Sequence, residues 1–472
     1  MKKYKLYIGG EFVESSSGHY IGVENPATGK IFAEVSDGNS EDVNNAVMAA
    51  REALNKWKNI GQRERAVYLE GFADYIEEYK EEIGRTITAE MGTAVKYVVE
   101  SHVMSSIEQA RFFAELLKKY SYEEIHENYI LRKEPIGIVA CLTPWNYPFY
   151  QETAKIFPAI AAGNCVVLKP SRIAPVSVQY LADAAEKIGL PAGVLNIITG
   201  KGENIGNALS AHQNIDMVSF TGSTEQGKKV GVKGISSNVK KVALELGGKS
   251  AAVLLKSADF KSASSNVMMQ CFLNTGQTCV APTRLIAPRE IKKELEDYMI
   301  EFASGFVVGD PMDKNTDIGP LVSRQAFDKV NSYIEKGVEE GAKLIFGGKA
   351  ESGDQGYYVL PTIFTETNND MTIGREEIFG PVLSVMYYDT EKEALEMVND
   401  SIYGLGGAVF GERNAALKFA EEIEAGVISI NGAELPTEAP FGGYKQSGLG
   451  RENGEVCFEE FLEIKSIAIS KN

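Results

Sequence analysis

Short runs of β-branched residues alternate with longer, charged amphipathic segments along most of the chain, and this alternation restricts the fold more than any other feature. Strands that are separated by helices pair in parallel and form a sheet that carries the helices on its faces. Three such strands are expected at 136–142, 165–168 and 217–220, each followed by small, polar or proline residues. We therefore predict an α/β fold with mainly parallel strands.

The first third of the chain is expected to depart from this pattern. Residues 4–13 predict a hairpin, 25–30 predict a turn, and 40–120 predict charged helices, after which the chain returns to strands. A chain of 472 residues also exceeds what one hydrophobic core usually supports. Two or three domains are therefore expected.

The charge balance excludes several classes of partner. The 48 basic and 65 acidic residues give a net charge of −17, which disfavours binding to nucleic acid and to anionic membranes. The most apolar windows, 136–145 and 156–168, are shorter than the ~20 residues of a membrane span. The first ten residues lack the apolar core of a signal peptide, so we predict a cytoplasmic protein.

The five cysteines form no CxxC pair and no zinc spacing with histidine, which predicts free thiols and no metal site. Cys279 differs from the other four because small and polar residues precede it. A thiolate can attack a carbonyl and hold the acyl group as a thioester, and a carboxylate such as Glu245 can activate the water that releases it. The other four cysteines keep the alternative interpretation of small buried hydrophobes. A cysteine hydrolase is disfavoured because no histidine lies near Cys279 in the sequence.

Loops at the carboxyl ends of the three expected strands indicate a nucleotide site, because open α/β sheets bind ligands at that edge. Residues 221–223 can cap a helix that begins near Thr224, and its free N–H groups can receive a diphosphate. Lys169 could reach phosphate or ribose oxygens, or be a solvated lysine at a strand end. The run from Gly200 to Gly206 is one residue longer than a dinucleotide fingerprint and equally fits a glycine-rich turn.

Seven motifs in order resemble the aldehyde dehydrogenase superfamily over residues 6–470. They are Thr143-Pro144-Trp145-Asn146, Lys169-Pro170-Ser171, Phe220-Thr221-Gly222-Ser223, Leu244-Glu245-Leu246-Gly247-Gly248-Lys249, Gly276-Gln277-Thr278-Cys279, Glu376-Glu377-Ile378-Phe379-Gly380-Pro381 and Pro440-Phe441-Gly442-Gly443-Tyr444-Lys445-Gln446-Ser447-Gly448.

The resemblance implies three parts of the chain. They are a Rossmann-like NAD(P)-binding domain at 1–116 and 136–247, an α/β catalytic domain at 248–447, and a small β oligomerisation ribbon with a tail at 117–135 and 448–472. It also implies a homodimer or homotetramer, in which a partner covers the exposed strand edge expected at 464–470.

The resemblance further implies a role for each site residue. Cys279 would be the nucleophile, the Asn146 amide and the Cys279 backbone N–H the oxyanion hole, Glu245 the base that activates water, and Lys155 a neighbour of the active site. The implied cofactor residues are Thr143, Pro144, Trp145, Lys169, Ser171, Arg172, Gly202, Gly206, Phe220, Gly222, Ser223, Leu246, Glu377 and Phe379. The implied substrate residues are Tyr147, Tyr150, Gln151, Glu434 and Phe441. Without the resemblance, Lys155 and Glu377 would be interpreted as surface charges.

Arg172 departs from the family pattern, because many members that prefer NAD carry a glutamate there to accept hydrogen bonds from the adenosine ribose. A guanidinium can instead pair with the 2′-phosphate of NADP. The cofactor is therefore expected to be NAD or NADP, with NADP use predicted from Arg172.

The sequence thus predicts an NAD(P)-dependent aldehyde dehydrogenase that oxidises a small-molecule aldehyde to a carboxylic acid through a Cys279 thiohemiacetal and thioester. One alternative is a CoA-acylating relative, in which a thiol takes the acyl group in place of water, and Glu245 argues against it. Another is a catalytically silent structural or binding protein on the same fold. The retained Asn146, Glu245, Cys279 and Glu377 give no reason to expect lost activity.

Overall fold

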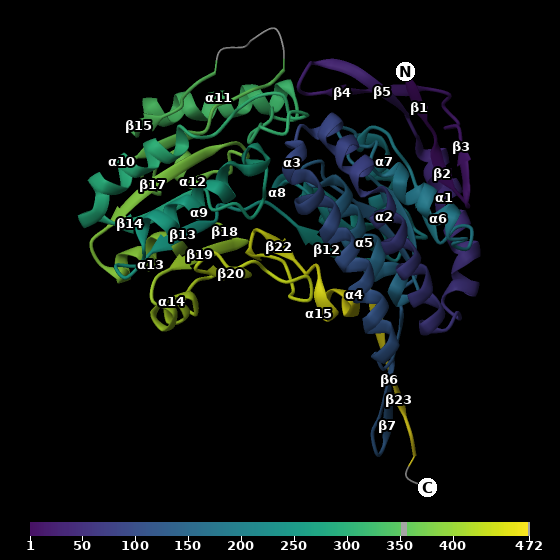
Figure 1. Ribbon diagram of the computed structural model, residues 1–472. Coiled ribbons are helices and arrows are strands. Elements are labelled where there is room, and N and C mark those ends of the chain that lie inside the picture. Colours follow the sequence, from purple (N-terminus) through teal and green to yellow (C-terminus); the bar gives the residue numbers. More distant parts are fainter. Residues whose placement is uncertain (351–355, 471–472) are drawn as a thin grey trace.

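The computed structural model describes residues 1–350 and 356–470 (Figure 1). Two α/β bodies lie side by side, and a narrow β ribbon with the C-terminus projects from one of them (Figure 1). The predicted catalytic segment 248–447 and the predicted tail 448–472 each include a few residues outside the described ranges. Across those ranges, no helix combines the length and apolarity that crossing a bilayer requires.

The first body contains an eight-stranded sheet in the order β22-β12-β11-β8-β9-β10-β2-β3. Its five central strands are parallel, and the outer strands are antiparallel to their neighbours. The strands are β2 (Leu6–Ile8), β3 (Glu11–Val13), β8 (Ile138–Leu142), β9 (Cys165–Lys169), β10 (Leu195–Ile197), β11 (Met217–Thr221), β12 (Lys241–Glu245) and β22 (Gly448–Leu449).

Helices cover this sheet, and they follow the expected alternation of strand and helix. They are α1 (Ser40–Trp57), α2 (Gln62–Met91), α3 (Val95–Val98), a π-helical turn (Val99–Met104), α4 (Ser105–Lys119), α5 (Pro148–Ala162), α6 (Gln179–Lys187), α7 (Gly202–Ala211), α8 (Thr224–Asn238) and α15 (Gly454–Glu460). Helices α1 and α5 contact β8 and β9, and α8 contacts β11 and β12. The predictions of an α/β fold, of the hairpin β2–β3 and of the three strands β8, β9 and β11 are confirmed.

Helix α5 lies in the centre of the first body, and most of its residues are apolar. All but one of its residues are buried, in contact with α2, α4, β8 and β9. Pro148 at its first turn has no N–H to leave unpaired, and Gly163 ends it in the left-handed region with φ 98°. Strands β8 and β9 are completely buried, as expected for strands of a parallel sheet covered on both faces.

The second body contains a seven-stranded sheet in the order β15-β16-β17-β14-β13-β19-β20, parallel except for β15. Its strands are β13 (Ala251–Leu254), β14 (Arg284–Pro288), β15 (Lys343–Phe346), β16 (Thr362–Thr365), β17 (Val382–Tyr388), β19 (Gly406–Phe410) and β20 (Val427–Ile430). Its helices are α9 (Phe260–Phe272), α10 (Lys292–Ala303), α11 (Arg324–Glu339), α12 (Thr372–Arg375), α13 (Glu391–Asn399) and α14 (Arg413–Ala420), with 3₁₀ turns at Leu273–Gly276 and Arg289–Ile291.

Three smaller sheets complete the fold. A two-stranded sheet joins β18 (Tyr403–Gly404) to β21 (Tyr444–Lys445), and a three-stranded one joins β1 (Lys2–Tyr4), β5 (Lys30–Ser36) and β4 (Tyr20–Asn25). The ribbon consists of β6 (Glu123–Ile125), β7 (Tyr129–Pro135) and β23 (Leu462–Ala468), in the order β23-β7-β6. Strand β23 pairs with β7 along its whole length, and its outer edge faces solvent, with Ile464 66% exposed.

The ribbon is shorter than the segments predicted for it. Helix α4 continues to Lys119, so pairing begins only at Glu123. Within the described residues 448–470, β22 pairs with β12 in the first sheet and α15 contacts α5, so β23 is the one element of this segment that belongs to the ribbon. The division into three domains stays a prediction, with these elements at its edges.

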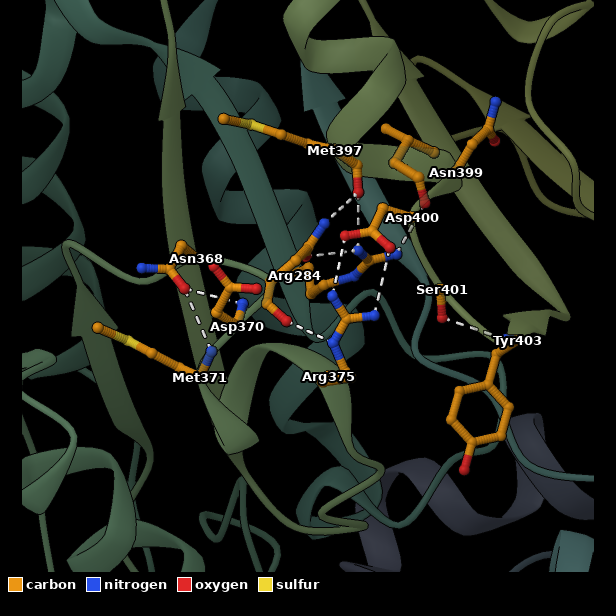
Figure 2. A network of polar contacts seen from close by, with 12 residues as sticks. Arg284, Asn368, Asp370, Met371, Arg375, Met397, Asn399, Asp400, Ser401 and Tyr403 are labelled. Carbon is orange, nitrogen blue, oxygen red and sulfur yellow. Dashed lines mark hydrogen bonds and ion pairs between the residues drawn. The ribbon is translucent and has the colours of Figure 1, made fainter.

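A buried arginine connects the second sheet to two neighbouring segments (Figure 2). Arg284 begins β14 and is 2% exposed. Its guanidinium donates to the carbonyls of Lys249 at 3.0 Å, Met397 at 3.0 Å and Val398 at 3.0 Å, and to Asn369 Oδ1 at 3.1 Å. Since burial opposes its charge, the pKa of Arg284 falls to about 10, which still leaves it protonated at neutral pH.

Replacing Arg284 by Met should destabilise the protein, because the buried carbonyls of Lys249 and Val398 lose their donor and each unpaired acceptor costs about 1–3 kcal/mol, without full additivity. We expect a loss of roughly 2–4 kcal/mol, seen as a lower midpoint of unfolding in urea. Arg289→Met is the matched control, because Arg289 is half exposed and its pair with Asp389 contributes less than about 1 kcal/mol. Equal midpoints for the two variants would contradict the role given to Arg284.

Candidate active site

A cleft of about 350 Å³ lies between the two α/β bodies and receives residues from both. Ten of the residues predicted for the site line it: Pro144, Trp145, Asn146, Gln151, Gly222, Ser223, Leu246, Cys279, Glu377 and Phe379. The first seven come from the first body and the last three from the second. The cleft therefore joins the predicted nucleophile to a large part of the predicted cofactor set.

The first-body residues meet because parallel strands end at one edge of their sheet. Strand β8 ends beside β9, with Thr143 N donating to Lys169 O at 3.2 Å. Strand β11 ends beside β12, with Thr221 opposite Glu245 and Gly222 N donating to Glu245 O at 3.0 Å. The loops that follow these strands consequently open on the cleft.

The N-terminus of helix α8 faces this edge. Ser223 caps it in extended conformation and accepts from Gln226 N at 3.4 Å, as the sequence predicts. Gly222 and Ser223 both line the cleft. A helix N-terminus presents unpaired N–H groups and a partial positive charge, which suit an anionic group such as a diphosphate.

Cys279 lies at the end of a loop that bends sharply after helix α9. Asn274, Thr275 and Gly276 have φ values of 55°, 56° and 69°, a left-handed run that only a well-packed loop can sustain. A Cβ on Gly276 would overlap the backbone of Gly380, so glycine is required for this close approach. Gln277 accepts from Val322 N at 2.9 Å and ties the loop to the second body. The thiol is thus presented from a rigid backbone.

Asn146 lies next to this loop, and both its side chain and its backbone form hydrogen bonds to it. Its Nδ2 donates to Gln277 O at 3.1 Å, and its backbone carbonyl accepts from Asn274 Nδ2 at 3.0 Å. Asn274 in turn accepts from Thr93 Oγ1 at 2.7 Å. A carboxamide carries two N–H donors, so one remains available to a group in the cleft.

The surroundings of Cys279 favour its neutral form. Burial first, and then the charges of Glu377, Glu245 and Glu452, raise the pKa of the thiol to about 12. A thiolate is the nucleophilic form, so activation requires a base or a change of charge in the cleft.

Glu245 does not line the cleft. It is 5% exposed and faces a second cavity of about 10 Å³, enough for one water, and neither carboxyl oxygen has a hydrogen-bond partner in residues 1–350 and 356–470. Burial and the neighbouring Glu452 raise the pKa of Glu245 well above its usual value. Gly442 touches this carboxyl, since a Cβ there would fall 2.6 Å from Glu245 Oε1.

Lys155 and Glu452 line the same small cavity. Lys155, on helix α5, is 1% exposed, forms an ion pair with Glu452, and donates to Ser219 Oγ at 3.0 Å. Burial opposes its charge, but Glu452 outweighs this and raises the pKa of Lys155. Glu452 also accepts from Thr221 Oγ1 at 3.2 Å. Lys155 is thus not a surface lysine, and it reaches the cavity that Glu245 faces.

Glu377 lies over a pair of glycines. Its carboxylate accepts from Gly248 N at 3.1 Å, and a Cβ on Gly247 would overlap both of its oxygens. Phe379 follows with φ 63° and packs edge to face on Trp145, with ring centroids 5.4 Å apart. Burial raises the pKa of the Glu377 carboxyl, whereas the hydrogen bond that it accepts from Gly248 N acts to lower this pKa.

The remaining predicted cofactor residues do not line this cleft: Thr143, Lys169, Ser171, Arg172, Gly202, Gly206 and Phe220. Lys169 is buried at the end of β9, where burial and the charge of Arg172 lower its pKa to about 8. Arg172 is exposed and, within the described ranges, forms no hydrogen bond or ion pair. Its neighbour Ile173 lines the cleft, so Arg172 lies at the margin of the site.

The predicted substrate residues divide into two groups. Tyr147 and Tyr150 are half buried near Cys279, where Tyr147 pairs with Thr278 Oγ1 at 2.8 Å and stacks on His102. Tyr150 accepts from Asn453 Nδ2 at 2.9 Å. By contrast, Glu434 is exposed on a loop, and Phe441 is half buried and paired through its backbone with Glu452.

Several residues of the cleft escaped the sequence prediction. They are Ile173, Gly247, Val322, Ser323, Gln325, Ala326, Lys329 and Ile378, whereas Thr221 belongs to the predicted diphosphate loop 221–223. Four of them lie at the start of helix α11 or just before it, where Ser323 caps the helix by accepting from Ala326 N at 3.2 Å. Lys329 donates to Glu377 O at 3.1 Å. The serine cap was the available signal, but a cap indicates a helix and not a ligand site. Among the described residues, no three His, Cys, Asp or Glu side chains gather as a metal site would require.

Fold and site together define a class: an enzyme with two α/β bodies that places a thiol and a carboxamide in a cleft beside a sheet edge of the kind that binds nucleotides. The description "Aldehyde dehydrogenase family" matches residues 12–467, and the chain belongs to this family. It is therefore an oxidoreductase that acts on aldehydes.

Solved structures agree with this assignment. Aldehyde dehydrogenase C from Pseudomonas syringae, solved as a cysteine-to-alanine variant with NAD+ and octanal, is 42% identical, has a TM-score of 0.97, and covers 98% of this chain and 96% of its own. An aldehyde dehydrogenase from Bartonella henselae is 37% identical, with a TM-score of 0.97 and 100% of both chains covered. Betaine aldehyde dehydrogenase from Staphylococcus aureus with NAD+ is 35% identical, with a TM-score of 0.96, covering 99% of this chain and 95% of that one.

The high pKa of Cys279 predicts a pH dependence for its alkylation by iodoacetamide in protein free of cofactor. Since the thiolate reacts and its fraction grows about tenfold per pH unit below the pKa, the rate should rise steadily from about pH 7 to 9. Mass spectrometry of the peptide that contains Cys279 measures this rate, and Cys279→Ala provides the blank. A plateau below about pH 8.5 would contradict the raised pKa.

Proposed function

We propose that this protein oxidises aldehydes to carboxylic acids with NAD+, using Cys279 as the nucleophile. One observation supports this above all: Cys279 and Asn146 share a cleft with Glu377 and the N-terminus of helix α8. Chemistry and nucleotide binding can therefore occur at one place.

The cleft fits a dinucleotide. The N-terminus of helix α8, next to the cleft residues Gly222 and Ser223, would supply unpaired N–H groups for a diphosphate, and Glu377 would supply acceptors for ribose hydroxyls. Lys329 lies beside Glu377 and can contribute a positive charge or a donor. The Pseudomonas and Staphylococcus structures with NAD+ are consistent with this placement. When bound, the nicotinamide ring accepts a hydride from the carbon that Cys279 has attacked.

The chain's own groups account for the steps around that transfer. Attack by Cys279 Sγ on the aldehyde creates an alkoxide, which the free N–H of Asn146 and the backbone N–H of Cys279 stabilise as the oxyanion hole. Losing one such donor typically lowers the rate by ~10²–10³. After hydride loss the acyl group remains on Sγ as a thioester, which water must hydrolyse.

Glu245 is the base for that water in this proposal. Its side chain faces the small cavity and would rotate toward Cys279. The charge of Glu245 already raises the pKa of the Cys279 thiol, so the two groups interact electrostatically. A proton taken from water can pass to the pair of Lys155 and Glu452 that lines the same cavity. This gives Lys155 a catalytic role in holding or moving a proton. It also favours hydrolysis over transfer of the acyl group to CoA.

The remaining expectations stay predictions. A small-molecule aldehyde would lie near Tyr147, Tyr150 and Gln151, and the exposed Glu434 would act at most from the surface. The open edge of β23 supports a homodimer or homotetramer in which a second copy covers it. A cytoplasmic location rests on the sequence alone.

Glu245→Gln tests whether Glu245 activates the water that hydrolyses the thioester or instead activates the Cys279 thiol. The amide cannot accept a proton from water, so acylation and hydride transfer should proceed while thioester hydrolysis slows. Rapid mixing with NAD+ and an aldehyde should then give a burst of about one NADH per active site, followed by slow turnover. Cys279→Ala is the control and should give neither burst nor turnover while still binding NAD+. Wild-type-like turnover in Cys279→Ala would remove Cys279 from the mechanism, and a slow phase without a burst would make Glu245 the base for the thiol.

Arg172 supports a second proposal, that NADP+ is accepted as well as NAD+. Its side chain is exposed at the margin of the cleft without a partner in the described ranges, and Lys169 lies near enough for the two charges to interact. A charge-assisted hydrogen bond to a phosphate contributes ~1.5–3 kcal/mol when well placed. Ser171, half buried between them, can add a donor.

Measuring kcat/KM for both cofactors in wild type and in Arg172→Glu tests this proposal. The guanidinium can pair with the 2′-phosphate, whereas a carboxylate would repel it, so preference should shift toward NAD+ by at least about tenfold. Lys201→Glu is a control for net charge, because Lys201 is exposed and paired with Asp37. The proposal would be contradicted if Arg172→Glu left the ratio of kcat/KM for NADP+ to kcat/KM for NAD+ unchanged, or if the wild-type protein did not use NADP+.

A further inference from the structure

Thr93 places a buried hydroxyl at the boundary between the two α/β bodies. It lies in the short link between helices α2 and α3 and is 3% exposed. Its Oγ1 donates to Asn274 Oδ1 at 2.7 Å and also lies 2.6 Å from Met91 Sδ. A hydroxyl carries one hydrogen, and an amide oxygen is a stronger acceptor than a thioether sulfur. The hydrogen of Thr93 Oγ1 therefore goes to Asn274, which belongs to the loop that presents Cys279.

The backbone on both sides of Thr93 is fixed against the second body. Gly92 ends helix α2 in the left-handed region with φ 93°. A Cβ on Gly319, in the loop between α10 and α11, would lie 2.0 Å from Gly92 O, so the two backbones are in close contact. After Thr93, Val95 N donates to Pro311 O of the same loop at 2.7 Å. The chain therefore has little freedom to move the Thr93 hydroxyl away from the catalytic loop.

The carboxamide of Asn274 uses its oxygen and both of its N–H groups. Its Nδ2 donates to Asn146 O at 3.0 Å and to Gln277 O at 3.3 Å. Its Oδ1 accepts from Thr93, and turning the amide over would place this oxygen against the two carbonyl oxygens. Asn274 is 8% exposed, so water cannot readily replace a lost partner. One orientation of this side chain therefore satisfies all its polar atoms.

Asn274 connects Thr93 to the oxyanion hole. It holds the backbone carbonyl of Asn146, and it also reaches Gln277 O, to which the Asn146 side chain donates at 3.1 Å. Gln277 lies two residues before Cys279. These three hydrogen bonds thus place Asn146 relative to the thiol. Donors stabilise a developing alkoxide best when they are already held where its charge forms.

We propose that Thr93 is a positioning residue of the oxyanion hole, whose hydroxyl fixes the Asn274 carboxamide and, through it, Asn146. This inference rests on the proposed role of Asn146 in stabilising the alkoxide. Without the hydroxyl, Asn274 Oδ1 is left buried without its donor, so the carboxamide is free to rotate and release the Asn146 carbonyl. Neither Thr93 nor Asn274 lines the cleft, so both act through Asn146 and not on the aldehyde or the cofactor.

Rapid mixing of the full-length protein with saturating NAD+ and an aldehyde tests the proposal through the rate of the first turnover. Thr93→Val keeps the shape of the side chain and removes the hydroxyl. The rate should fall about tenfold, because displacing a catalytic group by about 1 Å can cost ~10²-fold. The affinity for NAD+, measured by calorimetric titration, should not change. Thr93→Ser, which keeps the hydroxyl, should restore most of the rate.

Thr88→Val is the matched control. Thr88 is a buried threonine near the end of helix α2, and its hydroxyl has no hydrogen-bond partner in residues 1–350 and 356–470. This variant loses the same atom and should keep the wild-type rate. A wild-type rate in Thr93→Val, or a rate in Thr93→Ser as slow as that of Thr93→Val, would overturn the proposal.

Asn274→Asp tests the middle residue of this chain of hydrogen bonds. Aspartate has the same size, tolerates the left-handed φ of 55° and can still accept from Thr93, but it cannot donate to Asn146 O or Gln277 O. The first turnover should slow by ~10²-fold, since the hold on Asn146 is lost completely. An unchanged first turnover in this variant would show that Asn274 does not position Asn146, and the proposal would be wrong.

Double variants separate the failure of this inference from the failure of the proposed function. In an Asn146→Ala background the side chain that Thr93 positions is absent, so Thr93→Val should have no further effect. A further loss there would overturn the proposal, because the hydroxyl would then support the whole loop. If Asn146→Ala turns over at the wild-type rate, the oxyanion role of Asn146 and this inference both fall. If Asn146→Ala is slow and Thr93→Val is not, the oxyanion role stands and Thr93 has no part in it.

Discussion

Burial controls the charge of the groups at the active site more than pairing does. The thiol of Cys279 and the carboxyls of Glu245 and Glu377 all have raised pKa values, and burial is the first cause for each. Burial also lowers the pKa of Lys249, which favours its neutral amine. Arrival of a positively charged nicotinamide would favour the anionic forms of these acids and of the thiol. The site is thus set to respond electrostatically to its own cofactor.

Close packing of backbone makes this burial possible. Gly276 lies against Gly380, and Gly247 lies under Glu377, at positions where a Cβ would overlap its neighbours. Gly442 likewise leaves room for the Glu245 carboxyl, since a Cβ there would lie 2.6 Å from Glu245 Oε1. These glycines allow the loops around the site to approach one another and its carboxyl groups closely, which helps to bury the polar groups. The polar groups between them consequently interact in a medium of low dielectric constant.

Strand ends and local motifs were predictable from the sequence, whereas partners across the fold were not. Strands β8, β9 and β11 and the Ser223 cap follow from periodicity and capping residues, and Cys279 stands out by its small polar neighbours. Lys329 belongs to an ordinary amphipathic helix, and Glu452 lies far along the chain from Lys155, so neither carries a local signal. The hydrogen bond from Arg284 to the Lys249 carbonyl joins two strands of the second body and likewise carries no local signal.

The separation along the chain of the two strands that pair in the ribbon has a consequence for folding. Strand β7 ends at Pro135, whereas its partner β23 begins only at Leu462. Because domains generally fold as units, both α/β bodies can form before these two strands meet. The pairing of β23 with β7 would then be among the last steps of folding, and its formation would report that both bodies are in place.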